Sequence, residues 1–95
     1  MRKTIYTDEH AYIVNRLIEA RKEAGLEQKA VAKMLNVYPT CLCKIEAGQR
    51  KVDIVDLMEF SKIYKKRLLY FVEKYIEAQK EYEYLKGLLN SKKSF

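Results

Sequence analysis

The sequence predicts an all-α fold, and three observations carry that prediction. Only three glycines and one proline occur among 95 residues, which favours long helices over a turn-rich β fold. Apolar residues recur at steps of three and four, without the alternation of a strand. The length suits one small core, and a hydrophobic content of 48% is enough to build it.

The first helix is expected to begin at Asp8, acting as its N-cap, and to end at Gly25. Two basic residues in its last turn, Arg21 and Lys22, suit the negative end of the helix dipole. Its core face is expected to comprise Tyr12, Ile13, Leu17, Ala20 and Ala24.

Residues 28–47 have the pattern of two short helices joined by a tight turn, the second of them suited to a DNA groove. Their apolar faces are Val31, Ala32 and Leu35, then Leu42 and Ile45. Asn36 stands where the first of these helices must stop, and asparagine tolerates the left-handed conformation found there. Val37 is expected to pack inward. Pro39 suits the first position of the second helix, where its missing N–H does no harm.

A fourth helix is expected after Asp53, which can cap it. Its apolar face should comprise Ile54, Leu57, Met58, Phe60 and Ile63. From Leu68 the chain is rich in Glu, Lys, Tyr and Leu, and no glycine interrupts it before Gly87. This C-terminal helix carries residues at alternating steps of four and three, the spacing of a coiled-coil seam: Phe71, Tyr75, Ala78, Tyr82, Leu85 and Leu89.

This arrangement resembles the lambda-repressor-like helix-turn-helix family, which includes phage repressors, Cro proteins and regulators of the xenobiotic-response-element type. The resemblance runs from about His10 to Tyr75. It implies a five-helix DNA-binding domain over residues 1–72, with residues 73–95 forming an extended C-terminal helix. Two interpretations of that helix stay open: it pairs with a second copy, or it packs back on its own domain. We favour pairing, through Tyr75, Ala78, Tyr82, Leu85 and Leu89.

The recognition helix has few side chains that packing does not need. Contacts with base edges are expected from Thr40, Cys43 and Lys44, and apolar contact from Pro39. Contacts with the DNA backbone are expected from Gln28, Tyr38, Gln49, Arg50 and Lys51. Tyr38 has an equal alternative, packing against the preceding helix. The resemblance also implies a structural ion pair between Arg21 and Glu46.

Composition and charge indicate the class of partner that the protein is expected to bind. A net charge of +6 and a pI near 9.3 suit double-stranded DNA as the partner. We expect a sequence-specific regulator, in the first place a repressor, that binds a palindromic operator as a homodimer. The alternative is an antitoxin or accessory module whose C-terminal helix holds a protein partner. A second basic run, residues 62–67, is interpreted as a solvated surface rather than another DNA contact.

Other classes of function are not expected. An enzyme is disfavoured by the single histidine and by the lack of a nucleophile motif or a glycine-rich phosphate loop. Cys41 and Cys43 lie two residues apart without the further ligands that a metal needs, so no metal and no cofactor are expected. No apolar stretch suits a membrane span or a signal peptide, which predicts a cytoplasmic location.

Overall fold

A computed structural model describes the backbone of residues 7–93 and their side chains except those of residues 77–79, 81 and 89–93. Its elements are α1 (Asp8–Glu23), α2 (Gln28–Leu35), α3 (Pro39–Glu46), α4 (Ile54–Tyr64), the 3-10 helix η2 (Leu68–Val72) and α5 (Glu73–Lys93). The described residues form no strand, and the all-α prediction is confirmed. None of these helices has the length and apolar character needed to cross a membrane.

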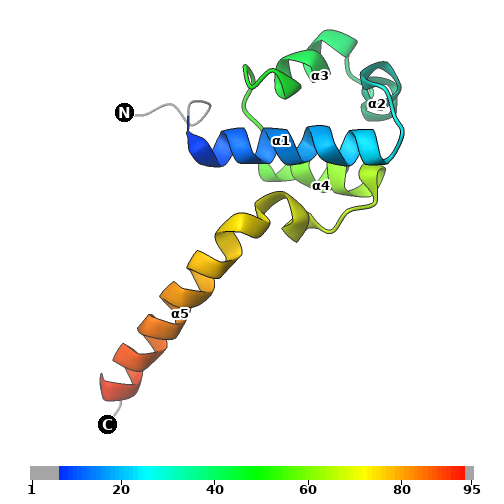
Figure 1. Ribbon diagram of the computed structural model, residues 1–95. Helices are drawn as coiled ribbons and strands as arrows, with labels where there is room; N and C mark the ends of the chain where they lie inside the picture. The colour runs from blue at the N-terminus through cyan, green and yellow to red at the C-terminus, as the bar shows by residue number, and fades with distance from the viewer. Residues whose placement is uncertain (1–6, 94–95) are drawn as a thin grey trace.

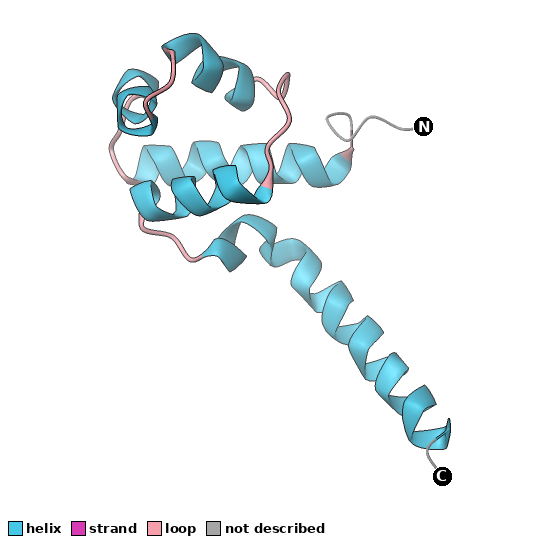
Figure 2. Ribbon diagram, turned by 180° about the vertical axis from the view of Figure 1, so that it is seen from behind, coloured by secondary structure: helices cyan, strands magenta, loops and turns pink. Residues whose placement is uncertain are grey.

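The helices surround α1. In Figure 1, α2 and α3 lie above α1, α4 lies behind it, and α5 extends away from the rest. The view from behind in Figure 2 shows α4 in front of α1 and the same extended course of α5. Helix α3 is therefore held on one side of the domain, and α5 leaves from the other.

Helix ends follow ordinary capping chemistry, with one correction. The N-cap of α1 is Thr7, whose hydroxyl accepts a hydrogen bond from the backbone N–H of His10 at 3.1 Å. The expectation that Asp8 caps this helix is therefore wrong; Asp8 is its first residue, where its charge still suits the helix dipole. Asp53 caps α4 as expected, and it forms a reciprocal capping box with Asp56.

Two helices end on residues in the left-handed conformation. Asn36 ends α2 with φ 58° and ψ 45°, which confirms the expectation for that position. Lys65 ends α4 with φ 56° and ψ 44°. A lysine has none of the local hydrogen-bonding compensation of asparagine, so its Cβ makes this conformation costly.

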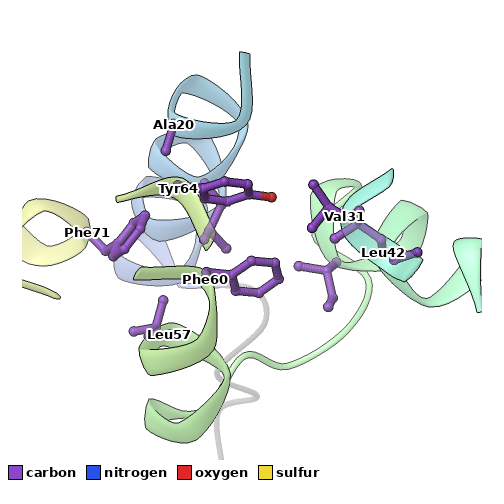
Figure 3. Close-up of a cluster of buried hydrophobic side chains, with 10 residues drawn as sticks. Ala20, Val31, Leu42, Leu57, Phe60, Tyr64 and Phe71 are labelled. Atoms are coloured by element: carbon purple, nitrogen blue, oxygen red, sulfur yellow. The ribbon is translucent and has the colours of Figure 1, made fainter. Parts of the chain in front are cut away.

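The core joins all elements of the domain at one cluster. Its buried members are Leu17, Ala20, Val31, Ala32, Leu42, Ile45, Leu57, Phe60, Tyr64 and Phe71. Figure 3 shows the rings of Phe60 and Tyr64 extending from α4 toward Val31 and Leu42, while Phe71 closes the opposite side. The two α4 rings stack with their centroids 5.6 Å apart.

Several apolar residues expected in the core lie outside it. Ala24, Ile54 and Met58 are exposed, and Val37 is 38% exposed. Ala24 follows the last residue of α1, Val37 lies in the turn after α2, and Ile54 and Met58 lie on the exposed face of α4. Two positions that the expected faces omitted, Val14 and Tyr64, are buried in their place. Tyr12 is half-buried, but its ring meets Tyr75 of α5 instead of the core.

The start of α5 is fastened to α1 by a group of aromatic and charged side chains. The Arg16 guanidinium lies 3.8 Å from the centroid of the Tyr70 ring, and its Nε donates to the Tyr70 carbonyl at 2.9 Å. Its Nη2 lies 3.3 Å from a carboxylate oxygen of Glu73. One residue further, the backbone N–H of Lys74 donates to the Tyr12 hydroxyl at 3.1 Å. The direction of α5 is thus set by contacts at its first turn.

The apolar side chains that the structure describes in the second half of α5 are uncovered. Tyr82, Tyr84, Leu85 and Leu88 are between 46% and 67% exposed. The expected seam residues Ala78 and Leu89 lie outside the described side chains. Among the described side chains of α5, packing on the rest of the domain is therefore limited to the first residues of the helix.

The left-handed position at Lys65 gives a prediction about stability. Lys65→Gly removes the Cβ that strains this conformation and should raise the free energy of unfolding by about 0.5–1 kcal/mol. The matched control is Lys62→Gly, within α4 at a side chain that is 72% exposed; it should lower the free energy of unfolding by about 1 kcal/mol. Denaturant unfolding of both variants measures the difference. A loss at position 65 as large as that at position 62 would contradict the proposed strain.

Candidate nucleic-acid interface

The turn between α2 and α3 fixes the angle at which α3 is presented. After Asn36 reverses the chain, the backbone N–H of Val37 returns to the carbonyl of Ala32 at 3.0 Å. Ala32 is fully buried and carries only a methyl group, which lets the two helices approach closely. Pro39 then takes the first position of α3. The turn is therefore short and closed by hydrogen bonds within the backbone.

Helix α3 has one buried face and one open face. Leu42 and Ile45 are buried, and Cys41 is half-buried beside them. The four residues expected to meet bases are all exposed: Pro39, Thr40, Cys43 and Lys44. Pro39 and Cys43 are four residues apart, as are Thr40 and Lys44, so the four side chains form one stripe along the helix. The stripe offers an apolar ring, a hydroxyl, a thiol and an ammonium group, of which the ammonium suits guanine O6 and N7.

The back of α3 is held by a charged network that also reaches α1 and α2. Both oxygens of Glu46 accept from the Arg21 guanidinium, at 2.7 and 3.0 Å. The Arg21 side chain is 14% exposed and that of Glu46 6%. The hydrogen bond that Arg21 donates to Glu46 raises the pKa of Arg21, and burial of the guanidinium opposes this rise only in part. The Arg21 guanidinium therefore stays protonated.

Gln28 belongs to the same network. Its Nε2 donates to Glu46 Oε1 at 2.9 Å, which leaves the second hydrogen of that amide nitrogen for another acceptor. Gln28 is the first residue of α2, and the preceding Glu27 makes no capping hydrogen bond with its side chain. The first N–H groups of α2 are thus available to an anion such as a phosphate.

The loop after α3 carries the basic residues of this surface. Gln49, Arg50 and Lys51 are all exposed. The backbone N–H of Gln49 donates to the Lys44 carbonyl at 2.9 Å, and the Arg50 carbonyl lies 3.2 Å from Nε2 of His10. With the hydrogen on Nε2, His10 donates to this carbonyl and ties the loop to α1.

Sequence reasoning missed His10 and gave no role to Tyr64. His10 is 7% exposed, and its only signal in the sequence is its rarity. Tyr64 is 4% exposed, and its hydroxyl has no hydrogen-bond partner among the described residues. Burial raises the pKa of Tyr64 well above its ordinary value, and the Glu46 carboxylate adds to the shift.

The exposure of Tyr38 excludes one of its two expected positions, and its contact with the DNA backbone stays a prediction. Tyr38 is 82% exposed, so it does not pack against α2, and it immediately precedes α3 as the N-cap residue.

The second basic run, residues 62–67, lies at the C-terminal end of α4. There Lys66 pairs with Glu23 at 3.3 Å and Lys62 pairs with Glu59 at 3.6 Å.

Comparison with known proteins gives one match. A family model described as helix-turn-helix matches residues 17–71, from within α1 to η2. Searches of curated proteins and of solved structures gave no significant match.

The Arg21–Glu46 pair gives a prediction about the stability of the interface. Glu46→Leu leaves the Arg21 guanidinium largely buried without its carboxylate, which should lower the free energy of unfolding by about 3 kcal/mol. The double variant Arg21→Met with Glu46→Leu removes both charges and should recover most of that loss. Denaturant unfolding of the two proteins tests this. A double variant as unstable as the single one would mean that the packing of Glu46, and not its charge, matters.

Proposed function

We infer the function from the family, because the chain belongs to the helix-turn-helix family of DNA-binding regulatory domains. We propose that it is a sequence-specific transcription regulator that binds a palindromic operator as a homodimer and represses the genes beside it. The single observation that carries this proposal is the open stripe of α3, Pro39, Thr40, Cys43 and Lys44, bordered by the exposed basic loop.

The chemistry of the surface supports two kinds of DNA contact. Arg50 and Lys51 in the loop after α3, and Gln28 with the first turn of α2, suit phosphates because they offer positive charge and N–H donors. The exposed stripe of α3 suits base edges. Phosphate contacts would then fix the position of α3, and the stripe would select the sequence.

The exposed apolar side chains described on α5 support a homodimer. Exposed apolar groups of this kind on a small protein usually mark an interface, and Tyr82, Leu85 and Leu88 follow one another at steps of three along the helix. Tyr75 is already half-buried against Tyr12 of its own chain, so the seam that we propose begins after it. Tyr84 and Leu88 widen the face beyond the seam expected from the sequence.

A dimer makes DNA recognition effective. One recognition helix contacts only a few base pairs, whereas two linked helices about 34 Å apart meet successive major grooves on one face of the duplex. Linking the two binding events raises the effective concentration of the second. A two-fold protein favours a palindromic site, and occupancy of such a site within a promoter blocks transcription.

Selection of bound fragments from random DNA tests the proposal directly. The expected result is a recovered sequence with two inverted half-sites whose centres lie one helical turn apart. Recovery of unrelated sequences with equal affinity would count against a sequence-specific regulator. Copurification of a second protein in equal amount, bound through α5, would favour the accessory-module alternative.

Lys44 gives a prediction about specificity. If its ammonium reads a base edge, Lys44→Ala should reduce discrimination at one base position by about 1–3 kcal/mol and leave the other positions unchanged. Competition binding with single-base variants of the selected site measures this. An equal loss for every sequence would identify Lys44 as a phosphate contact instead.

The basic loop gives the complementary prediction. Replacing both Arg50 and Lys51 with alanine should weaken binding to specific and random DNA alike, because phosphates carry no sequence information. The dependence of log affinity on log salt should flatten by about 1.8, at roughly 0.9 for each lost phosphate contact. Lys80→Ala, at an exposed lysine on α5, is the control and should leave the slope unchanged. An unaltered slope in the double variant would remove both residues from the interface.

The dimer gives the last prediction of this proposal. Tyr82→Glu with Leu85→Glu places like charges in the seam and should convert the dimer to a monomer that keeps its helical fold. The variant should bind the operator at least 10-fold more weakly, because the two half-sites are no longer linked. Molecular mass in solution and operator affinity are the measurements, with exposed Glu83→Gln as a control. A wild-type monomer at high concentration would contradict the dimer.

A further inference from the structure

A small cavity lies directly beneath the recognition helix. It has a volume of about 140 Å³, and residues from α2, the following turn, α3 and α4 line it. Its apolar walls are Leu35, Val37, Cys41, Ile45 and Phe60. Phe60 and Ile45 are almost fully buried, at 2% and 5% exposure, and form its interior. None of these five residues belongs to the surface proposed to meet DNA.

The cavity exists because two positions of the turn and α3 do not fill it. Val37 lines the cavity yet remains 38% exposed, so its side chain covers the space only in part. Cys41 is half-buried and contributes only a small thiol. A leucine at position 41 would extend into this space, which makes that position the natural one for testing it.

The size and lining of the cavity define the class of molecule that fits. An apolar cavity of about 150 Å³ is large enough to hold benzene. Around its mouth lie Arg50, Asp56 and Glu59, two carboxylates against one guanidinium. This balance disfavours an anion, and the carboxylates can accept a hydrogen bond from a ligand that carries a donor. The fitting class is a small neutral aromatic molecule with one hydroxyl or N–H group.

We propose that this cavity binds such an aromatic molecule and that its occupancy weakens DNA binding. The ligand would lie against Cys41 and Ile45 of α3 and against Arg50, so it would touch both the recognition helix and a residue proposed to hold phosphate. The Arg50 backbone is held by His10 at 3.2 Å, and therefore the ligand displaces the Arg50 side chain rather than the loop. This effect on DNA rests on the proposed function, whereas the binding of the ligand does not.

The two cysteines supply a test of binding that involves no DNA. Phenol is the probe, and benzoate, the same ring with a negative charge, is the control ligand. In a Cys43→Ser protein the remaining Cys41 should react with a thiol reagent about 10-fold more slowly when phenol is present at ten times its dissociation constant. In a Cys41→Ser protein the remaining Cys43, exposed and outside the cavity, should react at an unchanged rate. Benzoate should protect neither thiol.

Variants at position 41 separate a real site from a nonspecific effect. Cys41→Leu should fill the cavity and abolish the phenol-induced rise in the midpoint of thermal unfolding, about 7 °C in the wild type at ten times the dissociation constant. Cys41→Ala, which enlarges the cavity, should keep it. Equal protection of both cysteines, no protection of Cys41, or a Cys41→Leu protein that still responds to phenol would overturn the binding site.

The effect on DNA is then measured with the selected operator. Saturating phenol should weaken operator binding about 10-fold in the wild type, within the usual range of coupling between two sites. It should leave the affinity of Cys41→Leu unchanged. Phenol binding without any change in operator affinity would overturn the regulatory half of the proposal. Failure of the chain to bind any DNA would overturn the proposed function, and the thiol-protection result would still decide the site.

Discussion

The presentation of the recognition helix depends on the bidentate contact between Arg21 and Glu46. Here a residue of α1 binds the last residue of α3, and through Gln28 the network also reaches the first residue of α2. A largely buried ion pair contributes little net stability, since desolvation of both charges offsets much of their attraction. Its contribution is to geometry: two parallel hydrogen bonds fix the distance and the angle between the groups.

Most of the fold was predictable because local chemistry and tertiary packing agree. Asn36, Pro39 and Asp53 each have the residue type that a helix end requires, and the structure uses each as expected. The errors arise where two residues share one local signal or where packing decides. Thr7 and Asp8 are both good N-caps, and nothing in the sequence ranks them. Ile54 and Met58 fit the helical period, yet the face that α4 presents to its neighbours does not include them, and they lie outside the core.

The candidate site shows the same limit. The stripe of α3 followed from the sequence because the residues needed for packing could be subtracted from the helix. The hydrogen bond between His10 and the Arg50 carbonyl could not be predicted from the sequence, because these residues are 40 positions apart and the contact involves a backbone atom. The contact between Tyr12 and Tyr75, whose ring centroids lie 5.6 Å apart, could likewise not be predicted from periodicity. Both residues fit a helical face, but periodicity does not say which helix will cover that face.

The contacts of Arg16 attach the first turn of α5 rigidly to α1. Its guanidinium, packed on Tyr70 and paired with Glu73, makes the first turn of α5 part of the α1 scaffold. In the dimer that we propose, α5 is a rigid extension of its own domain. The exposed face of α5 then determines how the two DNA-binding domains are rotated relative to each other about the axis of the duplex. One residue inserted into α5 would turn that face by about 100° and advance it by about 1.5 Å. In the proposed dimer, the length of α5 therefore sets the spacing of half-sites that the two recognition helices can reach.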